Sequence, residues 1–117
     1  MSSSRPDNRP KMYLVVDSTL GMDKGKLCAQ TGHAVEDLVR RLEAKPTASY
    51  VAWRENYRTK IVLKGDGALL RSLRAKYPEA AAIIDAGLTQ IPANSLTVVG
   101  FPPLVHQPPE LQGLKLL

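Results

Sequence analysis

The alternation of short apolar runs with longer amphipathic stretches is the strongest constraint on this fold. Four apolar runs have the length and β-branched content of buried strands, at residues 12–16, 59–63, 80–84 and 96–99. Apolar side chains recur at helical spacing over residues 24–44 and 68–76, and a shorter helix is expected around residues 50–53. This order predicts an α/β fold in which helices connect the strands of one sheet.

The lengths of the connections predict how the strands pair. The first three strands are separated by helices, which favours parallel pairing with right-handed crossovers, whereas the short 85–95 connection favours an antiparallel fourth strand. We therefore predict a single-domain three-layer sandwich with a mixed four-stranded sheet, three strands parallel and one antiparallel, and helices on both faces. The domain spans residues 12–117, the polar segment 1–11 is expected to be disordered, and the proline-rich tail after residue 101 is expected to be largely extended.

The composition excludes several classes of protein. A chain of 117 residues, 44% of them hydrophobic, can bury a core without disulfides or metals. One cysteine and two histidines are too few for a disulfide framework or a structural zinc site. The N-terminus has no apolar signal region, and no apolar run approaches the roughly 20 residues that span a bilayer. These features predict a cytoplasmic protein that does not enter membranes.

The net charge of +5 is less informative than the distribution of the basic residues. Seven of them lie between positions 54 and 76: Arg54, Arg58, Lys60, Lys64, Arg71, Arg74 and Lys76. If these side chains share a face, they form a phosphate-binding patch, and the alternative is an ordinary solvated face.

The predicted 24–44 helix carries a polar stripe opposite its apolar face. Lys26, Gln30, His33 and Asp37 fall within this stripe at helical spacing. Solvent exposure alone explains such a stripe, but the helix that carries it is reached through the loop that follows the first strand, and ligands of open α/β sheets bind beyond the carboxyl ends of strands. The stripe is therefore a candidate site.

Two segments place polar groups at those strand ends. The first contains GMDKGKL, which is not a nucleotide-binding P-loop, because only three residues separate its glycines and Leu27 replaces the magnesium-binding Ser or Thr. Lys24 and Lys26 remain as candidate anion ligands at the start of a helix. The second segment, DAGLTQIPANS, offers Asp85, Thr89 and Gln90, although such a loop is often only a local turn.

Nucleophilic catalysis is not supported. Cys28 and His33 lie about 140° apart around the predicted helix, so the histidine cannot activate the thiol. We interpret Cys28 as a small buried side chain and His33 as a packing or orienting group. The chain also lacks the GxSxG element of serine hydrolases.

The motifs in their order resemble one enzyme family. MYLVVD, DKGKLCAQTGHA, TKIVLK, DAGLTQIP, LTVVG and a closing LKLL follow one another as in the archaeal and eukaryotic type of peptidyl-tRNA hydrolase, over about residues 12–117. The resemblance implies an enzyme that hydrolyses the ester between a peptide and the 3′ ribose of tRNA. It also implies a compact α/β protein, commonly dimeric, that needs no metal or organic cofactor.

The resemblance also implies which residues form the site. The catalytic candidates carried over from the family motifs are Lys26, Gln30, Asp85 and Thr89. Together with the charge pattern, the candidate substrate-binding residues are Lys24, His33, Gln90, Arg58, Lys60, Arg71 and Arg74. This chain has Asp17 and Leu88 where the family usually has arginines, and its tail is short and proline-rich, which we expect to weaken RNA binding more than it alters the fold.

The four catalytic candidates can divide an ester hydrolysis between them. Asp85 with Thr89 would hold and polarise a water molecule, while Lys26 with Gln30 would bind the carbonyl oxygen or the terminal nucleotide. A salt bridge between Lys26 and Asp85 could instead only link the helix to the loop.

For the whole chain, the alternatives to the hydrolase are an inactive relative that binds tRNA or another RNA as an adaptor, and an interaction module that uses the proline-rich tail.

Overall fold

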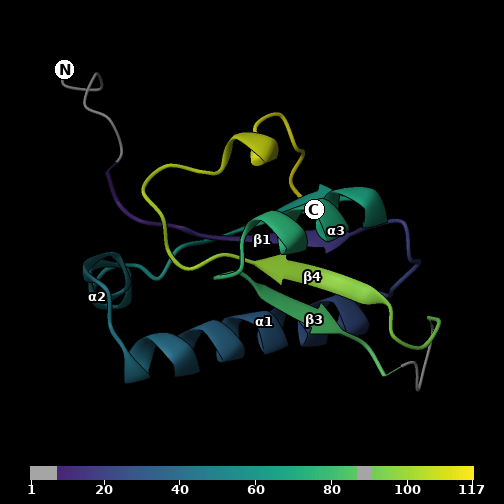
Figure 1. Ribbon diagram of the computed structural model, residues 1–117, viewed down its shortest axis with the longest axis horizontal. Coiled ribbons are helices and arrows are strands. Elements are labelled where there is room, and N and C mark those ends of the chain that lie inside the picture. The colour runs from purple at the N-terminus through teal and green to yellow at the C-terminus, as the bar shows by residue number, and fades with distance from the viewer. Residues whose placement is uncertain (1–7, 87–90) are drawn as a thin grey trace.

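Four strands form one sheet in the order β2-β1-β4-β3 (Figure 1). The computed structural model describes residues 8–86 and 91–117. The strands are β1 (Met12–Asp17), β2 (Lys60–Gly65), β3 (Ala81–Ile84) and β4 (Leu96–Gly100). The helices are α1 (Lys24–Ala44), α2 (Ala48–Glu55), α3 (Gly67–Lys76) and the short 3₁₀ helix η1 (Pro109–Leu111). Both long helices therefore lie where the periodicity of the sequence predicted them.

The pairing of the strands differs from the prediction. Strand β1 pairs in parallel with β2, from Met12 opposite Lys60 to Asp17 opposite Gly65. Strand β4 lies between β1 and β3 and is antiparallel to both. The expectation of three parallel strands with one antiparallel strand was therefore wrong, because β1·β2 is the single parallel pair in the described part of the chain. Strand β3 has the same direction as β1 but is separated from it by β4.

Alternate residues of β1 contact different helices. One cluster of buried side chains contains Met12, Leu14, Val16, Ala34, Leu38, Leu42, Tyr50, Trp53, Ala81, Ile83 and Val98. The other contains Tyr13, Val15, Leu63, Leu70, Leu73, Val99, Phe101 and Leu111. Because successive side chains of a strand point to opposite faces, α1 and α2 pack against one face and α3 and η1 against the other. Figure 1 shows α1 and α3 on either side of β3 and β4.

A glycine in β4 allows α1 to approach the sheet closely. A Cβ atom on Gly100 would lie 2.8 Å from Leu14 Cδ2 and 3.2 Å from Leu38 Cδ1, so any side chain there would force these leucines apart. The first turn of α1 is held by Asp23, whose Oδ1 accepts the backbone N–H of Lys26 at 2.9 Å. Packing and cap together set the position of Lys26 relative to the strand ends.

The buried face of α1 is rotated from the predicted one. Its buried residues are Gln30, Ala34, Leu38 and Leu42. Around an ideal helix, Gln30 lies only about 40° from Ala34, at the edge of the apolar face rather than opposite it. The helix turns this edge toward β4, so the expected polar stripe is divided: Gln30 is buried, whereas His33 is exposed.

The terminal segments pack on the sheet. Lys11, within the segment expected to be disordered, forms an antiparallel bridge with Leu104, while residues 1–7 lie outside the described part of the chain. The tail is not simply extended: η1 buries Leu111 near α3, and Leu116 forms a bridge with Leu63. No helix among the described residues is long and apolar enough to cross a membrane.

Candidate active site

Lys26 and Asp85 form an ion pair at the end of the sheet. Lys26 lies in the first turn of α1, and Asp85 directly follows β3. The Lys26 Nζ is 2.6 Å from Asp85 Oδ1, and the two side chains are 14% and 9% exposed. The Asp85 backbone is also fixed, since its N–H donates to the Ser95 carbonyl and its carbonyl accepts the Asn94 N–H. A cation and a carboxylate are thus held together at a largely desolvated position that still reaches solvent.

Gln30 is a buried side chain of α1, one helical turn after Lys26. It is 4% exposed, and its Nε2 donates to Thr97 Oγ1 at 2.9 Å. The fully buried Thr97 hydroxyl in turn donates to the Ile83 carbonyl at 3.1 Å. These two bonds connect α1, β4 and β3 close to both members of the ion pair. Sequence reasoning missed Thr97, although a lone hydroxyl in the apolar run LTVVG was a signal for it.

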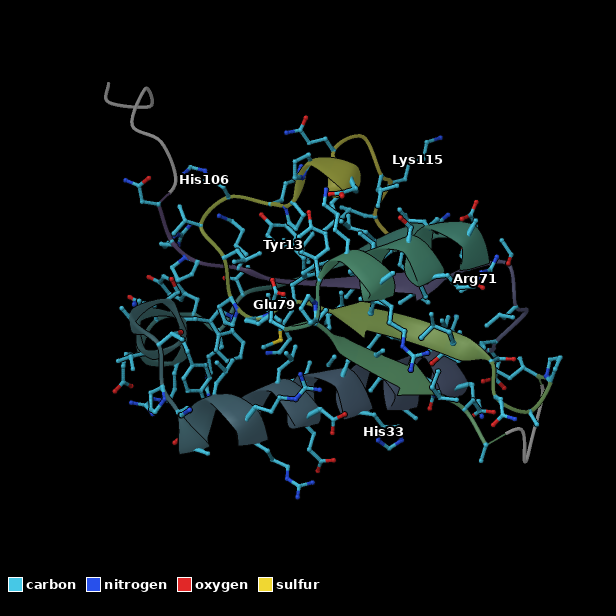
Figure 2. The ribbon with its side chains drawn as sticks, in the orientation of Figure 1. Tyr13, His33, Arg71, Glu79, His106 and Lys115 are labelled. Atoms are coloured by element: carbon cyan, nitrogen blue, oxygen red, sulfur yellow. The ribbon has the colours of Figure 1, made fainter. Side chains whose placement is uncertain are left out.

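The remaining candidates near the pair have different positions. Thr89 and Gln90, and also Leu88, lie outside the described residues. Lys24 is exposed in the first turn of α1. His33 is exposed about two turns after Lys26 and extends away from the sheet in Figure 2. The structure therefore brings together Lys26 and Asp85, with Gln30 below them.

The basic residues between positions 54 and 76 do not share one face. Arg58 and Lys60 lie at the start of β2, the opposite end of the sheet from Asp85. Lys60 Nζ is 5.3 Å from the centroid of the Trp53 ring and donates to the Arg58 carbonyl at 3.1 Å. Arg71 and the other α3 cations are on another element, so the condition for a single phosphate-binding patch, that all seven side chains share one face, is not met.

Two of these basic side chains also have acidic partners. Arg54 Nη1 is 2.8 Å from Glu43 Oε2, and Lys76 Nζ is 2.6 Å from Glu110 Oε2. Tyr77 donates a further hydrogen bond to Glu110 at 2.7 Å. The hydrogen bonds from Lys76 and Tyr77 hold the pKa of Glu110 at about 2. This carboxylate therefore serves to fasten η1 to α3.

Arg71 and Arg74 line a cavity of about 320 Å³ on the α3 face of the same sheet end. Buried Asp17 also lines it, and its Oδ1 accepts the N–H and the hydroxyl of Thr19. A Cβ atom on Gly67 would lie 3.3 Å from Asp17 Oδ2 and 2.9 Å from Arg71 Nη1. The carboxylate of Asp17, a position where the family resemblance leads us to expect an arginine, thus lies near the Arg71 guanidinium on α3.

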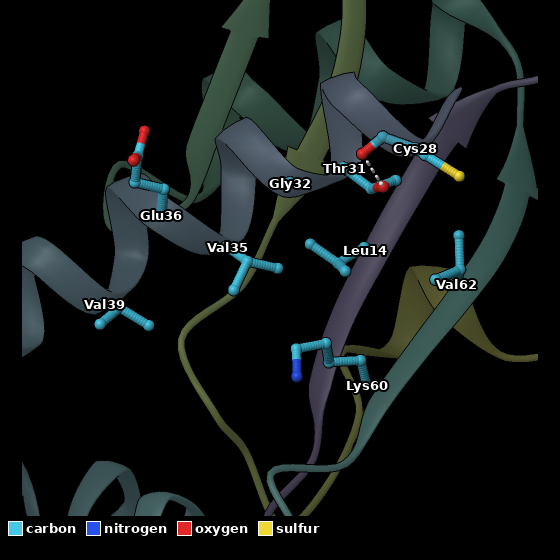
Figure 3. A pocket seen from close by; sticks show the side chains of 9 residues that line it. All are labelled: Leu14, Cys28, Thr31, Gly32, Val35, Glu36, Val39, Lys60 and Val62. Carbon is cyan, nitrogen blue, oxygen red and sulfur yellow. Dashed lines mark hydrogen bonds between the residues drawn. The ribbon is translucent and has the colours of Figure 1, made fainter. Parts of the chain in front are cut away.

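Cys28 lines an apolar groove of about 490 Å³ between α1 and β2 (Figure 3). Its side chain is exposed, so the interpretation of Cys28 as a buried residue was wrong. The reason is the rotation of α1, which turns Gln30 to the sheet and Cys28 toward the groove. In the described ranges 8–86 and 91–117, no three His, Cys, Asp or Glu side chains are grouped as a metal site.

Comparison with known proteins places the chain in a family. The model of peptidyl-tRNA hydrolase PTH2 matches residues 10–110. The chain is 36% identical to a probable peptidyl-tRNA hydrolase 2 of Caenorhabditis elegans over 92% of its length, but covers 36% of that protein. It is 40% identical to peptidyl-tRNA hydrolase 2 of Saccharomyces cerevisiae, covering 50% of it. It is 38% identical to the peptidyl-tRNA hydrolase of Staphylothermus marinus and covers 81% of that enzyme. The chain therefore belongs to the PTH2 family of peptidyl-tRNA hydrolases.

Proposed function

We propose that this chain hydrolyses the ester bond that joins a peptide to the 3′ ribose of tRNA. The observation that carries the proposal is the Lys26–Asp85 ion pair at the end of the sheet, in a chain of the peptidyl-tRNA hydrolase family. An ester has a reasonable leaving group, so a base for the attacking water and a cation for the developing oxyanion supply the required chemistry.

The two side chains divide the reaction between them. The Asp85 carboxylate accepts a proton from water while the water oxygen bonds to the carbonyl carbon. The Lys26 ammonium donates a hydrogen bond to the carbonyl oxygen as negative charge develops on it. The bond from carbon to the ribose oxygen then breaks, and the proton on Asp85 passes to that oxygen. Thr89 would hold the water beside Asp85.

The role of Gln30 follows from its burial. Because its amide is bonded to Thr97 and is 4% exposed, we propose that Gln30 acts by holding α1 against β4 rather than by contacting the ribose. Lys26 is one helical turn before Gln30, so this contact determines where the ammonium group lies. Gln30 is thus a positioning residue in this mechanism.

The tRNA is proposed to cross the end of the sheet that carries the ion pair. Lys24, His33, Gln90, Arg71 and Arg74 remain the candidates for contacts there, whereas Arg58 and Lys60 could contact only a distant part of the tRNA. We also propose a homodimer, as the family resemblance implies, and a cytoplasmic location, as the composition predicts. Light scattering on the purified chain tests the homodimer directly.

Release of peptide from N-acetylaminoacyl-tRNA tests the function. The unmodified chain should release the acyl group, and Lys26→Ala and Asp85→Asn should each lower the rate by about 100-fold or more. Lys45→Ala is the matched control, because Lys45 is an exposed lysine at the far end of α1. Unmeasurable release by the unmodified chain, or equal rates in all four proteins, would refute the proposal.

A further inference from the structure

Strand β3 forms an edge of the sheet that leads directly into the candidate active site. It is the last strand in the order β2-β1-β4-β3, and Asp85 is the residue that follows it. In the described part of the chain, no segment pairs with the outer side of β3. Figure 1 shows the strand at the border of the sheet, with α1 on one side and α3 on the other.

The hydrogen bonds between the strands determine which backbone groups face this outer edge. Phe101 donates its backbone N–H to the Tyr13 carbonyl, so the backbone N–H and C=O groups of Phe101 point toward β1. Because these groups alternate in direction along an antiparallel strand, those of Val99 also point toward β1, and those of Val98 and Gly100 point toward β3. Their partners Ile83 and Ala81 consequently bond toward β4. This pattern leaves the N–H and C=O groups of Ala82 and Ile84 directed away from the sheet.

The side chains of β3 do not block this edge. Its sequence is AAII, with no charge and no proline, although native proteins usually protect edge strands with such residues. The extra residue at the register shift between β3 and β4 is Thr97, so the irregularity lies in β4. Ile84 is also 41% exposed, which is unusual for a large apolar side chain. With respect to residues 8–86 and 91–117, the edge is thus regular, apolar and open.

We propose that this edge binds the peptide moiety of the substrate as an added parallel strand. The proposal rests on the proposed function, because the occupant is the acyl group of peptidyl-tRNA. Main-chain hydrogen bonds to a strand edge bind a peptide through contacts that do not depend on its side chains. Asp85 lies at the carboxyl end of β3, so the carboxyl end of the peptide must lie there too, which requires the parallel direction.

The parallel direction assigns individual hydrogen bonds. In a parallel pair, one edge residue donates to one residue of the added strand and accepts from the residue two positions later. The last peptide residue therefore donates its N–H to the Ile84 carbonyl, and its ester carbonyl continues toward Lys26 and Asp85. The third-last residue accepts from Ile84 and donates to the Ala82 carbonyl. The N–H of the second-last residue points away from the protein.

The experiment compares substrates that share one tRNA and one C-terminal residue. We expect kcat/KM to rise about tenfold from N-acetylalanyl-tRNA to penta-alanyl-tRNA with a blocked N-terminus, as a few net hydrogen bonds are added. Methylation of the third-last amide nitrogen should lower kcat/KM by about tenfold, whereas the same methyl on the second-last nitrogen should change it less than about twofold.

A protein variant adds an independent measurement. Ala82→Pro removes an outward N–H, which an edge strand tolerates, and should lower kcat/KM for the penta-alanyl substrate only. If this variant fails to fold, the methylated substrates decide alone. Cleavage of the N-acetyl substrate with no length dependence, or with equal or reversed effects of the two methyl groups, would overturn the edge proposal while the hydrolase stands. Cleavage of no substrate would overturn both.

Discussion

The ion pair between Lys26 and Asp85 gives a prediction that separates catalysis from structure. Lys26→Met leaves the Asp85 carboxylate without its lysine at a position that is 9% exposed. Removing one partner of a fully buried pair costs about 3–5 kcal/mol, and the residual exposure here reduces that to about 2–3 kcal/mol. Asp85→Asn should cost less, because the amide oxygen still accepts a hydrogen bond from Lys26.

The double variant Lys26→Met with Asp85→Asn should regain stability but not activity. With both charges gone, no unbalanced ion remains, and we expect at least half of the lost free energy of unfolding to return. Peptide release should stay lower by about 100-fold or more in both single variants and in the double variant, since neither the base nor the oxyanion donor is restored. Stability and activity would then change independently.

Urea denaturation and single-turnover release of N-acetylaminoacyl-tRNA measure the two quantities. Arg54→Met is the control for stability, because its pair with Glu43 is exposed on both sides and its loss should change the free energy of unfolding far less than the loss of Lys26. If activity returned together with stability in the double variant, Lys26 and Asp85 would be only a link between helix and loop, and the proposed mechanism would be wrong.

Three further predictions concern other contacts. Gln30→Leu should lower the free energy of unfolding by about 1–3 kcal/mol in urea, since it removes the bond to Thr97. Because the pKa of Glu110 is lowered in the folded state, its contribution to stability is present above its ordinary pKa of 4.5 and is lost as the pH falls toward 2. Between these two pH values, the thermal midpoint of Glu110→Gln should therefore decrease less than that of the unmodified chain. Reversing the charges of Arg71 and Arg74 should weaken tRNA binding and flatten its salt dependence by about one unit of logarithmic slope per lost phosphate contact, as filter binding would show. An unchanged slope would mean that these arginines form only a solvated face.

Local patterns predicted the elements of this fold well. The expected helix over residues 24–44 coincides with α1, because its start has an aspartate cap and Pro46 follows its end. The four strands were also found within two residues at each end. These features depend on residues near in sequence. Pairing depends on distant ones, so connection lengths alone could not show that β4 separates β3 from β1.

The periodicity of its sequence could not predict how α1 is rotated about its own axis. The apolar residues predict a buried face centred on the leucines and valines, yet the helix buries Gln30 and leaves Cys28 exposed. The difference arises from the sheet: the Thr97 hydroxyl in β4 offers a partner for an amide, and Gly100 allows close packing on that side. A polar residue at the edge of an apolar face is buried when the opposite element supplies its hydrogen bond.

The unpredicted strand order is also what creates the candidate site. Lys26 and Asp85 are 59 positions apart, and neither local motif shows that they meet. Helix α1 follows β1 but packs on β4 and β3 as well, because β4 occupies the place beside β1 and carries β3 at its outer side. The end of β3 therefore lies beside the first turn of α1. Had β3 paired directly with β1 in parallel, β3 itself would occupy the place of β4. Thr97 of β4 could then not join Gln30 to the Ile83 carbonyl. Because β4 lies between β1 and β3, β3 is at the border of the sheet. The strand order that brings Asp85 to Lys26 therefore also exposes the edge of β3, which ends at Asp85.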